Sequence, residues 1–240
     1  MYLSRIQLNP KRRDAWRLLG SPQRLHAAVL QSFPAPPTGD QGGAARVLWR
    51  LDHDDHRADL YVVSPEQPDF AHLAEQAGWP TTERGATKPY AAFLERLAAG
   101  QVWAFRLAAN PTRYLPHPTT GRMQRFGHVT VAQQEQWLLD KAETSGFRVT
   151  ATIRRTVDGG ESAIPELAVT ERTMHRFDRR SADPGPGRPR KASVTLTVAQ
   201  FDGRLEVTDP DALRRALVTG IGPAKAYGCG LLTLARAEQG

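Results

Sequence analysis

The sequence predicts an α+β protein made of two tandem βαββαβ units. In the first 110 residues, the hydrophobic patterns follow the order strand, helix, strand, strand, helix, strand, and a looser copy of this order follows Asn110-Pro111. The chain of 240 residues is long enough for two compact domains of about 100 to 120 residues each. Because this order is that of the split βαβ or ferredoxin-like unit, we expect two ferredoxin-like domains, residues 1–110 and residues 111–240.

The first unit begins with residues 1–8 (MYLSRIQL), in which apolar and polar residues alternate as in a strand. Helix is expected over residues 14–29, with an interruption at residues 20–22, where Ser21 suits the N-cap position and Pro22 the first helical position. The remaining expected elements are strands at 46–51 and 59–63, an amphipathic helix at 88–99 and a strand at 101–109.

The second unit has a weaker pattern, in which each element can still be placed. The expected elements are a helix at 132–144, a strand at 147–153, a hairpin of 194–201 with 205–207 about Asp202-Gly203, a helix that starts at 209–211 and a last strand at 231–234. Residues 178–190 (DRRSADPGPGRPR) are rich in proline, glycine and arginine, which predicts a mobile basic insertion.

Composition excludes several classes of protein. No apolar run approaches the roughly 18 residues that a membrane-spanning helix needs, and residues 1–5 are not followed by the apolar core of a secretory signal. The one cysteine, Cys229, cannot form an intramolecular disulfide or build a thiolate zinc site alone. We therefore expect a cytoplasmic protein.

The charge of the chain favours a polyanionic partner. Lys plus Arg total 32 and Asp plus Glu total 25, so the formal net charge is +7, and two stretches, residues 1–24 and 172–191, carry +5 each. Arginine dominates both stretches and binds phosphate in a planar fork. The alternative for any charged run is a solvated surface, and we prefer it for Arg188 and Arg190.

The most distinctive segment is residues 220–230, GIGPAKAYGCG, between a predicted helix and the last predicted strand. Glycines let a backbone approach a ligand closely and direct several N–H groups at one anion. The spacings of the Walker A and Rossmann motifs are absent. From this pattern alone, a phosphate-binding loop and a tight helix-to-strand connection both remain open.

This ending, with the LLTL that follows it, resembles the C-terminal signature of the CRISPR-associated repeat-processing endoribonucleases, the CasE subunits of type I-E Cascade. The opening MYLSRIQLNP, the stretch VLWRL at 47–51 and FRLAANP at 105–111 resemble the same family, so the resemblance covers nearly the whole chain. It implies two ferredoxin-like domains and cleavage of CRISPR repeat RNA at the foot of a stem-loop. It also implies a reaction that uses no metal or other cofactor, and residence in Cascade beside the other subunits.

Histidine suits proton transfer in RNA cleavage through the 2′-hydroxyl, because its unperturbed pKa is about 6.5. Of the seven histidines, His26 lies on the first predicted helix. In the family a histidine of that helix is catalytic, so the resemblance assigns this role to His26, as general base or general acid. Relatives often carry a tyrosine three residues earlier, where this chain has Gln23, and glutamine cannot transfer a proton at neutral pH.

The expected RNA contacts come from the basic stretches and from the glycine-rich segment. A hairpin that carries the arginines of residues 172–180 could straddle an RNA stem, whose groove favours readout of shape and phosphate. The candidate RNA-binding residues are Arg12, Arg13, Arg24, Arg172, Arg176, Arg179, Arg180, Gly220, Gly222, Lys225 and Gly228.

Three alternatives compete with these assignments. His53 and His56, in DHDDH, offer metal ligands, but their spacing fits no structural zinc pattern and they lie in a predicted hairpin turn. The five tryptophans could stack on bases, although four fall on predicted core faces. A catalytically weak or inactive repeat-RNA-binding subunit is the rival function, kept open by Gln23, and an unrelated DNA-binding protein is a third.

Overall fold

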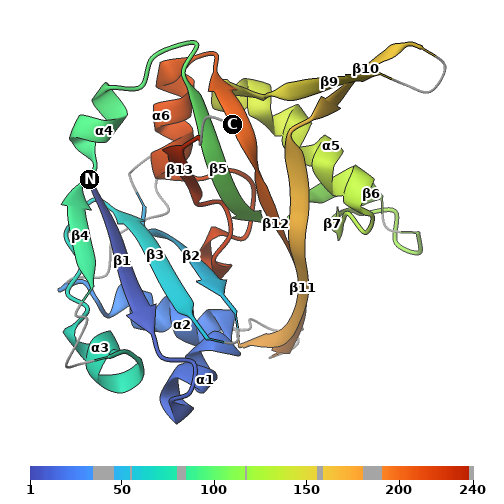
Figure 1. The fold of residues 1–240 in the computed structure, drawn as a ribbon. Helices are drawn as coiled ribbons and strands as arrows, with labels where there is room; N and C mark the ends of the chain where they lie inside the picture. The colour runs from blue at the N-terminus through green and yellow to red at the C-terminus, as the bar shows by residue number, and fades with distance from the viewer. Residues whose placement is uncertain are drawn as a thin grey trace.

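The computed structural model describes residues 1–34, 46–54, 56–79, 85–116, 118–155, 159–180 and 191–237. Two antiparallel sheets lie side by side, with helices packed against them (Figure 1). The first unit contains β1 (Tyr2–Leu8), α1 (Arg13–Leu19), α2 (Pro22–Leu30), β2 (Leu48–His53), β3 (Ala58–Ser64), α3 (Ala71–Ala77) and β4 (Ala86–Pro89). The short helix α4 (Ala91–Glu95) leads to the second unit.

The second unit is larger and carries two small hairpins outside its main sheet. Its elements are β5 (Val102–Ala109), β6 (Thr112–Pro116), β7 (Met123–Gly127), α5 (Val131–Ala142), η1 (Glu143–Ser145), β8 (Phe147–Val149), β9 (Ala151–Arg155), β10 (Glu161–Pro165), β11 (Leu167–Arg180), β12 (Lys191–Val207), α6 (Pro210–Thr219), η2 (Lys225–Tyr227) and β13 (Leu232–Arg236). The pair β6–β7 and the pair β9–β10 each form a separate two-stranded sheet.

The strand order is the same in both units. The first sheet runs β2-β3-β1-β4 and the second runs β11-β12-β5-β13, with β8 also paired to β12, and every pairing is antiparallel. In each unit the third strand therefore lies between the first and the second, and the fourth pairs with the outer side of the first, which is the ferredoxin-like arrangement. The predicted fold class is confirmed.

The strand expected at 101–109 belongs to the other sheet. We assigned it to the first unit, but β5 pairs with β12 and β13, and the fourth strand of the first sheet is the short β4. The expected helix at 88–99 is also only α4, because Lys88 and Pro89 belong to β4 and pair with β1, and the helix ends at Glu95. The second helix of the first unit is α3, which our sequence interpretation did not include. The predicted domain boundary at residue 110 thus falls after a strand that the second sheet contains.

The predicted hairpin about Asp202-Gly203 is also wrong, because β12 continues through both residues. The carboxylate of Asp202 accepts a hydrogen bond from Arg106 Nε on the adjacent strand, at 2.6 Å. A Cβ at Gly203 would lie 3.0 Å from the Phe105 ring, and still closer to a backbone carbonyl oxygen. Glycine is needed here because neighbouring groups approach closely, and not because the chain turns.

The two units share a hydrophobic core. One cluster lies between the first sheet and α1, α2 and α3. The other combines the fully buried Leu48 and Val63, on β2 and β3, with residues of the second sheet, α5 and α6, such as Leu107, Leu138 and Leu213. Since residues of both sheets pack in the second cluster, the units are not independent bodies.

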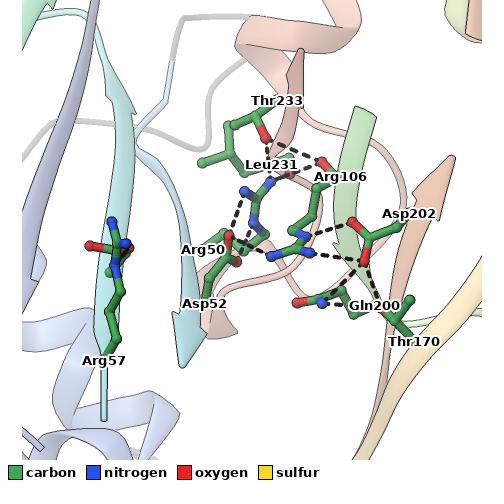
Figure 2. A network of polar contacts seen from close by, with 10 residues as sticks. Arg50, Asp52, Arg57, Arg106, Thr170, Gln200, Asp202, Leu231 and Thr233 are labelled. Atoms are coloured by element: carbon green, nitrogen blue, oxygen red, sulfur yellow. Dashed lines mark hydrogen bonds and ion pairs between the residues drawn. The ribbon is translucent and has the colours of Figure 1, made fainter. Parts of the chain in front are cut away.

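A polar network joins the sheets beside this core (Figure 2). The Arg50 side chain on β2 is only 2% exposed and donates to the Asp52 carboxylate at 2.7 and 2.9 Å. It also donates to the Arg106 carbonyl oxygen at 2.8 Å and to Thr233 Oγ1 at 2.8 Å, on β5 and β13. Arg106 in turn pairs with Asp52 and Asp202. The buried guanidinium therefore fixes β2 against two strands of the second sheet.

Candidate functional site

Helix α2 begins as the sequence predicted. Ser21 is the N-cap, its hydroxyl accepts a hydrogen bond from the Arg24 backbone N–H, and Pro22 is the first helical residue. The apolar face of α2 is buried against the first sheet, while His26 is half-buried beside that face. The helix thus anchors His26 at the boundary between core and solvent.

Trp49, on β2, is the partner of His26. The Trp49 indole N–H donates to His26 Nδ1 at 3.2 Å, and the two rings lie 22° from parallel with centroids 6.5 Å apart. Since an indole nitrogen can only donate, Nδ1 must be the unprotonated nitrogen, and the neutral ring carries its proton on Nε2. Burial also lowers the pKa of His26, so both effects favour the neutral ring.

The glycine-rich segment packs on tryptophan rings. Gly222 and Gly228 have φ values of +79° and +81°, and a Cβ added to either would lie within 2.9 Å of a ring, that of Trp137 or Trp49 respectively. Only glycine fits both the backbone conformation and the space at these positions. The loop therefore rests directly on the residue that bonds His26.

His26 and the glycine-rich loop line the same cleft, which has a volume of about 870 Å³. Among the lining residues are Arg46 before β2, Arg125 on β7, Lys141 on α5 and Lys225 in the loop, and none of the lining residues in the described chain is an Asp or Glu. Burial, and then the charge of Arg46, lower the pKa of Lys225. Four cationic residues that line one cleft, with no carboxylate among the described lining residues, can bind an anion such as a phosphate.

The four predicted RNA-binding residues of the loop divide between the cleft and its support. Gly222 and Lys225 line the cleft itself. Gly228 packs on Trp49, and Gly220, at the end of α6, would place a Cβ 2.9 Å from Leu48. The loop is thus both a tight connection and a wall of the cleft, so the two interpretations of its pattern are compatible.

The predicted arginines are dispersed. Arg12 donates to the carbonyl oxygen of Gly78 at 3.1 Å and so anchors the end of α3, while Arg13 and Arg24 are exposed. On β11, Arg172 and Arg176 are exposed on one face of the strand, and Arg172 donates to the Val129 carbonyl oxygen at 3.1 Å. Of the insertion predicted at 178–190, the first three residues belong to β11 instead. Residues 181–190 and the side chains of Arg179 and Arg180 lie outside the described residues.

Sequence reasoning missed Arg46, Tyr114, Arg125 and Lys141, all of which line the cleft with His26. They come from four separate segments, and no spacing in the chain relates them. Conversely, Asp52 and His53 of the DHDDH segment are the last residues of β2, and the backbone N–H groups of His56 and Arg57 both donate to Asp54 Oδ1 at 2.8 Å. Among the described residues, no group of three His, Cys, Asp or Glu side chains is placed to hold a metal ion.

Of the five tryptophans, Trp49 and Trp137 are buried, whereas Trp16 is 74% exposed and Trp79 is 39% exposed. The expectation of a core position thus holds for Trp49 and Trp137, and in part for Trp103, which is half-buried against the core that both units share. In the described ranges, no helix has the length and apolar character needed to cross a bilayer.

Comparison with known proteins gives consistent matches over almost the full chain. The family model described as CRISPR associated protein matches residues 1–236. The CRISPR-associated endoribonuclease Cse3 of Thermus thermophilus is 31% identical over 240 residues, which cover 98% of this chain and 100% of that protein. A solved structure of CRISPR endoribonuclease Cse3 bound to a 19 nt RNA is 29% identical, with a TM-score of 0.71 and coverage of 98% of this chain and 100% of that one.

A more distant likeness concerns the fold alone. One chain of a CRISPR RNA-guided surveillance complex is 24% identical, with a TM-score of 0.64 and coverage of 99% of this chain and 100% of that one.

Proposed function

The chain belongs to the family of CRISPR-associated proteins, and we propose that it is an endoribonuclease that cleaves precursor CRISPR RNA at the foot of its repeat stem-loops. The observation that carries this proposal is the cleft, which half-buried His26 lines together with the cationic residues Arg46, Arg125, Lys141 and Lys225. A relative that is an endoribonuclease supports the reaction class, and a solved relative with bound RNA supports the substrate class.

The proposed reaction is an attack of the ribose 2′-hydroxyl on the adjacent phosphorus. The O2′–P bond forms, the P–O5′ bond breaks, and the products carry a 2′,3′-cyclic phosphate and a 5′-hydroxyl. One proton leaves the 2′-oxygen and one reaches the leaving 5′-oxygen. The cations of the cleft stabilise the charge that develops on the phosphoryl oxygens, and the cleft walls hold the 2′-oxygen in line.

His26 is the proposed proton-transfer residue. The hydrogen bond from Trp49 to Nδ1 orients the ring and leaves Nε2 for the cleft. The protonated ring, the imidazolium, can deliver its Nε2 proton to the leaving 5′-oxygen and becomes neutral in doing so. A positioned group of this kind accelerates a reaction by roughly 10²- to 10⁴-fold. No step in this mechanism requires a metal ion.

The rest of the RNA is proposed to lie along the arginines of β11. Arg172 and Arg176 project from one face of that strand and suit the phosphates of a duplex stem. The family resemblance further supports retention of the cleaved RNA within a Cascade assembly, beside the other subunits.

A binding subunit with weak or absent catalysis is the second candidate, since Gln23 cannot transfer a proton from its place one helical turn before His26. Incubation of the protein with an end-labelled repeat hairpin in excess EDTA distinguishes the two. We expect one cut and a cyclic phosphate on the upstream fragment. RNA that stays intact under saturating binding supports the binding subunit instead.

A further inference from the structure

The hairpin β6–β7 presents an aromatic ring and a guanidinium as a pair. Tyr114 and Arg125 stand directly opposite each other in the register of the two strands, and Arg125 Cζ lies 5.0 Å from the centroid of the Tyr114 ring. Tyr114 is 57% exposed, so the ring is not part of a core. The pair therefore offers a flat, cationic and largely solvent-exposed surface.

This surface belongs to the same cleft as His26. Thr112, Tyr114 and Arg125 line the cleft from the hairpin, while His26 lines it from α2 and Lys225 from the loop. Residues 112–127 include Arg113, Arg122 and Arg125 and no Asp or Glu. The hairpin thus adds positive charge and an aromatic face to a cleft that already suits a phosphate.

We infer that Tyr114 and Arg125 form a stacking platform for an unpaired nucleobase of one of the two nucleotides that flank the scissile phosphate. The inference rests on the proposed function and extends it to a determinant of substrate choice. In a duplex stem the bases are already stacked on one another, so only unpaired nucleotides can offer a free face to a protein ring. Every base has such a face, so the platform selects for the presence of a base more than for its identity.

The geometry favours stacking over the other uses of an exposed tyrosine. The Arg125 guanidinium packs on one face of the Tyr114 ring, and arginine also stacks well on bases. A base placed on the other face of the ring, or on the outer face of the guanidinium, would therefore extend one continuous stack. A role for the phenol hydroxyl in proton transfer, in place of the missing family tyrosine, is the competing use. It differs in one testable respect, since phenylalanine preserves stacking and removes the hydroxyl.

The test is a double-mutant cycle between protein and RNA. Tyr114→Leu and Tyr114→Phe are compared on the repeat hairpin and on hairpins with an abasic site at each nucleotide beside the cleavage position. We expect Tyr114→Leu to lower kcat/KM by about 10- to 100-fold on intact RNA, the range of one base–aromatic stack, and Tyr114→Phe to stay within a few-fold of the wild type. At one of the two positions, the abasic RNA should lower kcat/KM of the wild type by a similar factor. The same abasic RNA should not lower kcat/KM of Tyr114→Leu any further.

Ile153→Ala is the matched control, because Ile153 is an exposed apolar residue on β9 that does not line the cleft. The platform would be overturned if, at both abasic positions, the fold-decrease in kcat/KM from Tyr114→Leu and that from the abasic site simply multiplied when the two changes were combined. A loss in Tyr114→Phe equal to that in Tyr114→Leu would overturn it in favour of the hydroxyl, and a normal rate in Tyr114→Leu would also overturn it.

A binding measurement separates this inference from the proposed function. A hairpin that carries 2-aminopurine beside a 2′-deoxy cleavage nucleotide should lose fluorescence on binding to the wild type, and should lose much less on binding to Tyr114→Leu. This quenching does not require cleavage. Quenching by the wild type without any cleavage of all-ribose RNA would support the platform and overturn the proposed nuclease function. Cleavage of all-ribose RNA with equal fluorescence in both proteins would overturn the platform and support the nuclease function.

Discussion

Trp49 donates the hydrogen of its indole N–H to His26 Nδ1 over 3.2 Å. The bond is possible only while Nδ1 is unprotonated, so it stabilises the neutral ring with its proton on Nε2. Trp49 is itself 2% exposed and lies under Gly228 of the glycine-rich loop. The loop, the tryptophan and the histidine thus form one chain of contacts from the second unit to the first.

Replacement of His26 with alanine tests the proton-transfer residue. We expect His26→Ala to slow cleavage by roughly 10²- to 10⁴-fold and to change hairpin affinity by no more than a few-fold, because one neutral side chain contributes little to an electrostatic interface. Single-turnover cleavage and filter binding measure the two quantities.

The same variant shows which oxygen receives the proton. With a 5′-thio leaving group, departure needs no proton, so His26→Ala should cut this substrate nearly as fast as the wild type does. A 2′-deoxy nucleotide at the cleavage site should block cutting in both proteins. A persistent defect on the thio substrate would instead place His26 at the 2′-hydroxyl.

The pH dependence follows from the state of the same ring. Burial lowers the pKa of His26, so its inflection should lie below the ordinary value of 6.5. Since the imidazolium is the form that delivers a proton to the 5′-oxygen, we expect kcat/KM to be full below this inflection and to fall as the pH rises through it. Trp49→Phe removes the donor that favours the neutral form, so it should move the inflection upward.

NMR titration of the His26 ring nitrogens measures that shift directly. Trp103→Phe is the matched control, because Trp103 Nε1 donates to Gln101 and not to a histidine. If Trp49→Phe and Trp103→Phe titrate alike at His26, the Trp49 bond does not set the protonation state.

The charge of β11 is tested by the salt dependence of binding. Replacement of Arg172, Arg176 and Arg179 with glutamine should weaken hairpin binding and reduce the slope of log K against log salt by about one for each phosphate that is no longer neutralised. Replacement of Lys88, Arg96 and Arg148, which do not line the cleft, removes the same formal charge and should leave the slope nearly unchanged. Equal slopes in the two triple variants would place the RNA surface elsewhere.

Two glycines with similar φ values allow the effect of backbone conformation to be distinguished from the effect of a steric clash with a neighbouring ring. Gly100 and Gly228 have φ values of +82° and +81°, and asparagine tolerates this region. A Cβ at Gly100 meets nothing within 4 Å, whereas a Cβ at Gly228 would lie 2.6 Å from the Trp49 ring. Gly228→Asn should therefore lower the unfolding midpoint in urea and the cleavage rate, and Gly100→Asn should change neither appreciably. Normal folding and cleavage in Gly228→Asn would reduce the loop to a connector.

The buried guanidinium is tested by unfolding. Arg50→Met removes five hydrogen bonds and leaves partners in the interface unpaired, so we expect a decrease of about 3–5 kcal/mol in the free energy of unfolding. Arg148→Met breaks an exposed ion pair with Glu206 and should cost less than about 1 kcal/mol. Equal costs would mean that the network does not stabilise the junction.

Elements that depend on local patterns were predicted correctly from the sequence. Ser21 and Pro22 predicted the start of α2, and alternation predicted β1, because both signals depend on near neighbours. The prediction failed for β5, whose pattern fits either sheet and whose partners, β12 and β13, lie about a hundred residues further along. It failed for Asp202-Gly203 because a turn pattern can equally serve a close approach of backbones.

The site divides in the same way. His26 and Lys225 could be predicted because motifs carry them, and the structure brings both to one cleft. Their roles remain predictions that the experiments above test. Arg46, Arg125 and Lys141 carry no local signal, since each is an ordinary basic residue until the fold brings it beside the others.

The junction of the two sheets has a consequence for the lifetime of the complex. Arg50 and the common core fix the first sheet, whose Trp49 bonds His26, against the second sheet and α5, whose Trp137 and Lys141 line the cleft, so the cleft has a set width. A site built in this way incurs little entropic cost when RNA enters, because few protein groups become ordered. The same rigidity keeps the two walls from parting to let a fragment leave. We therefore expect slow dissociation after the cut, with each molecule processing one transcript and then serving as its lasting end cap.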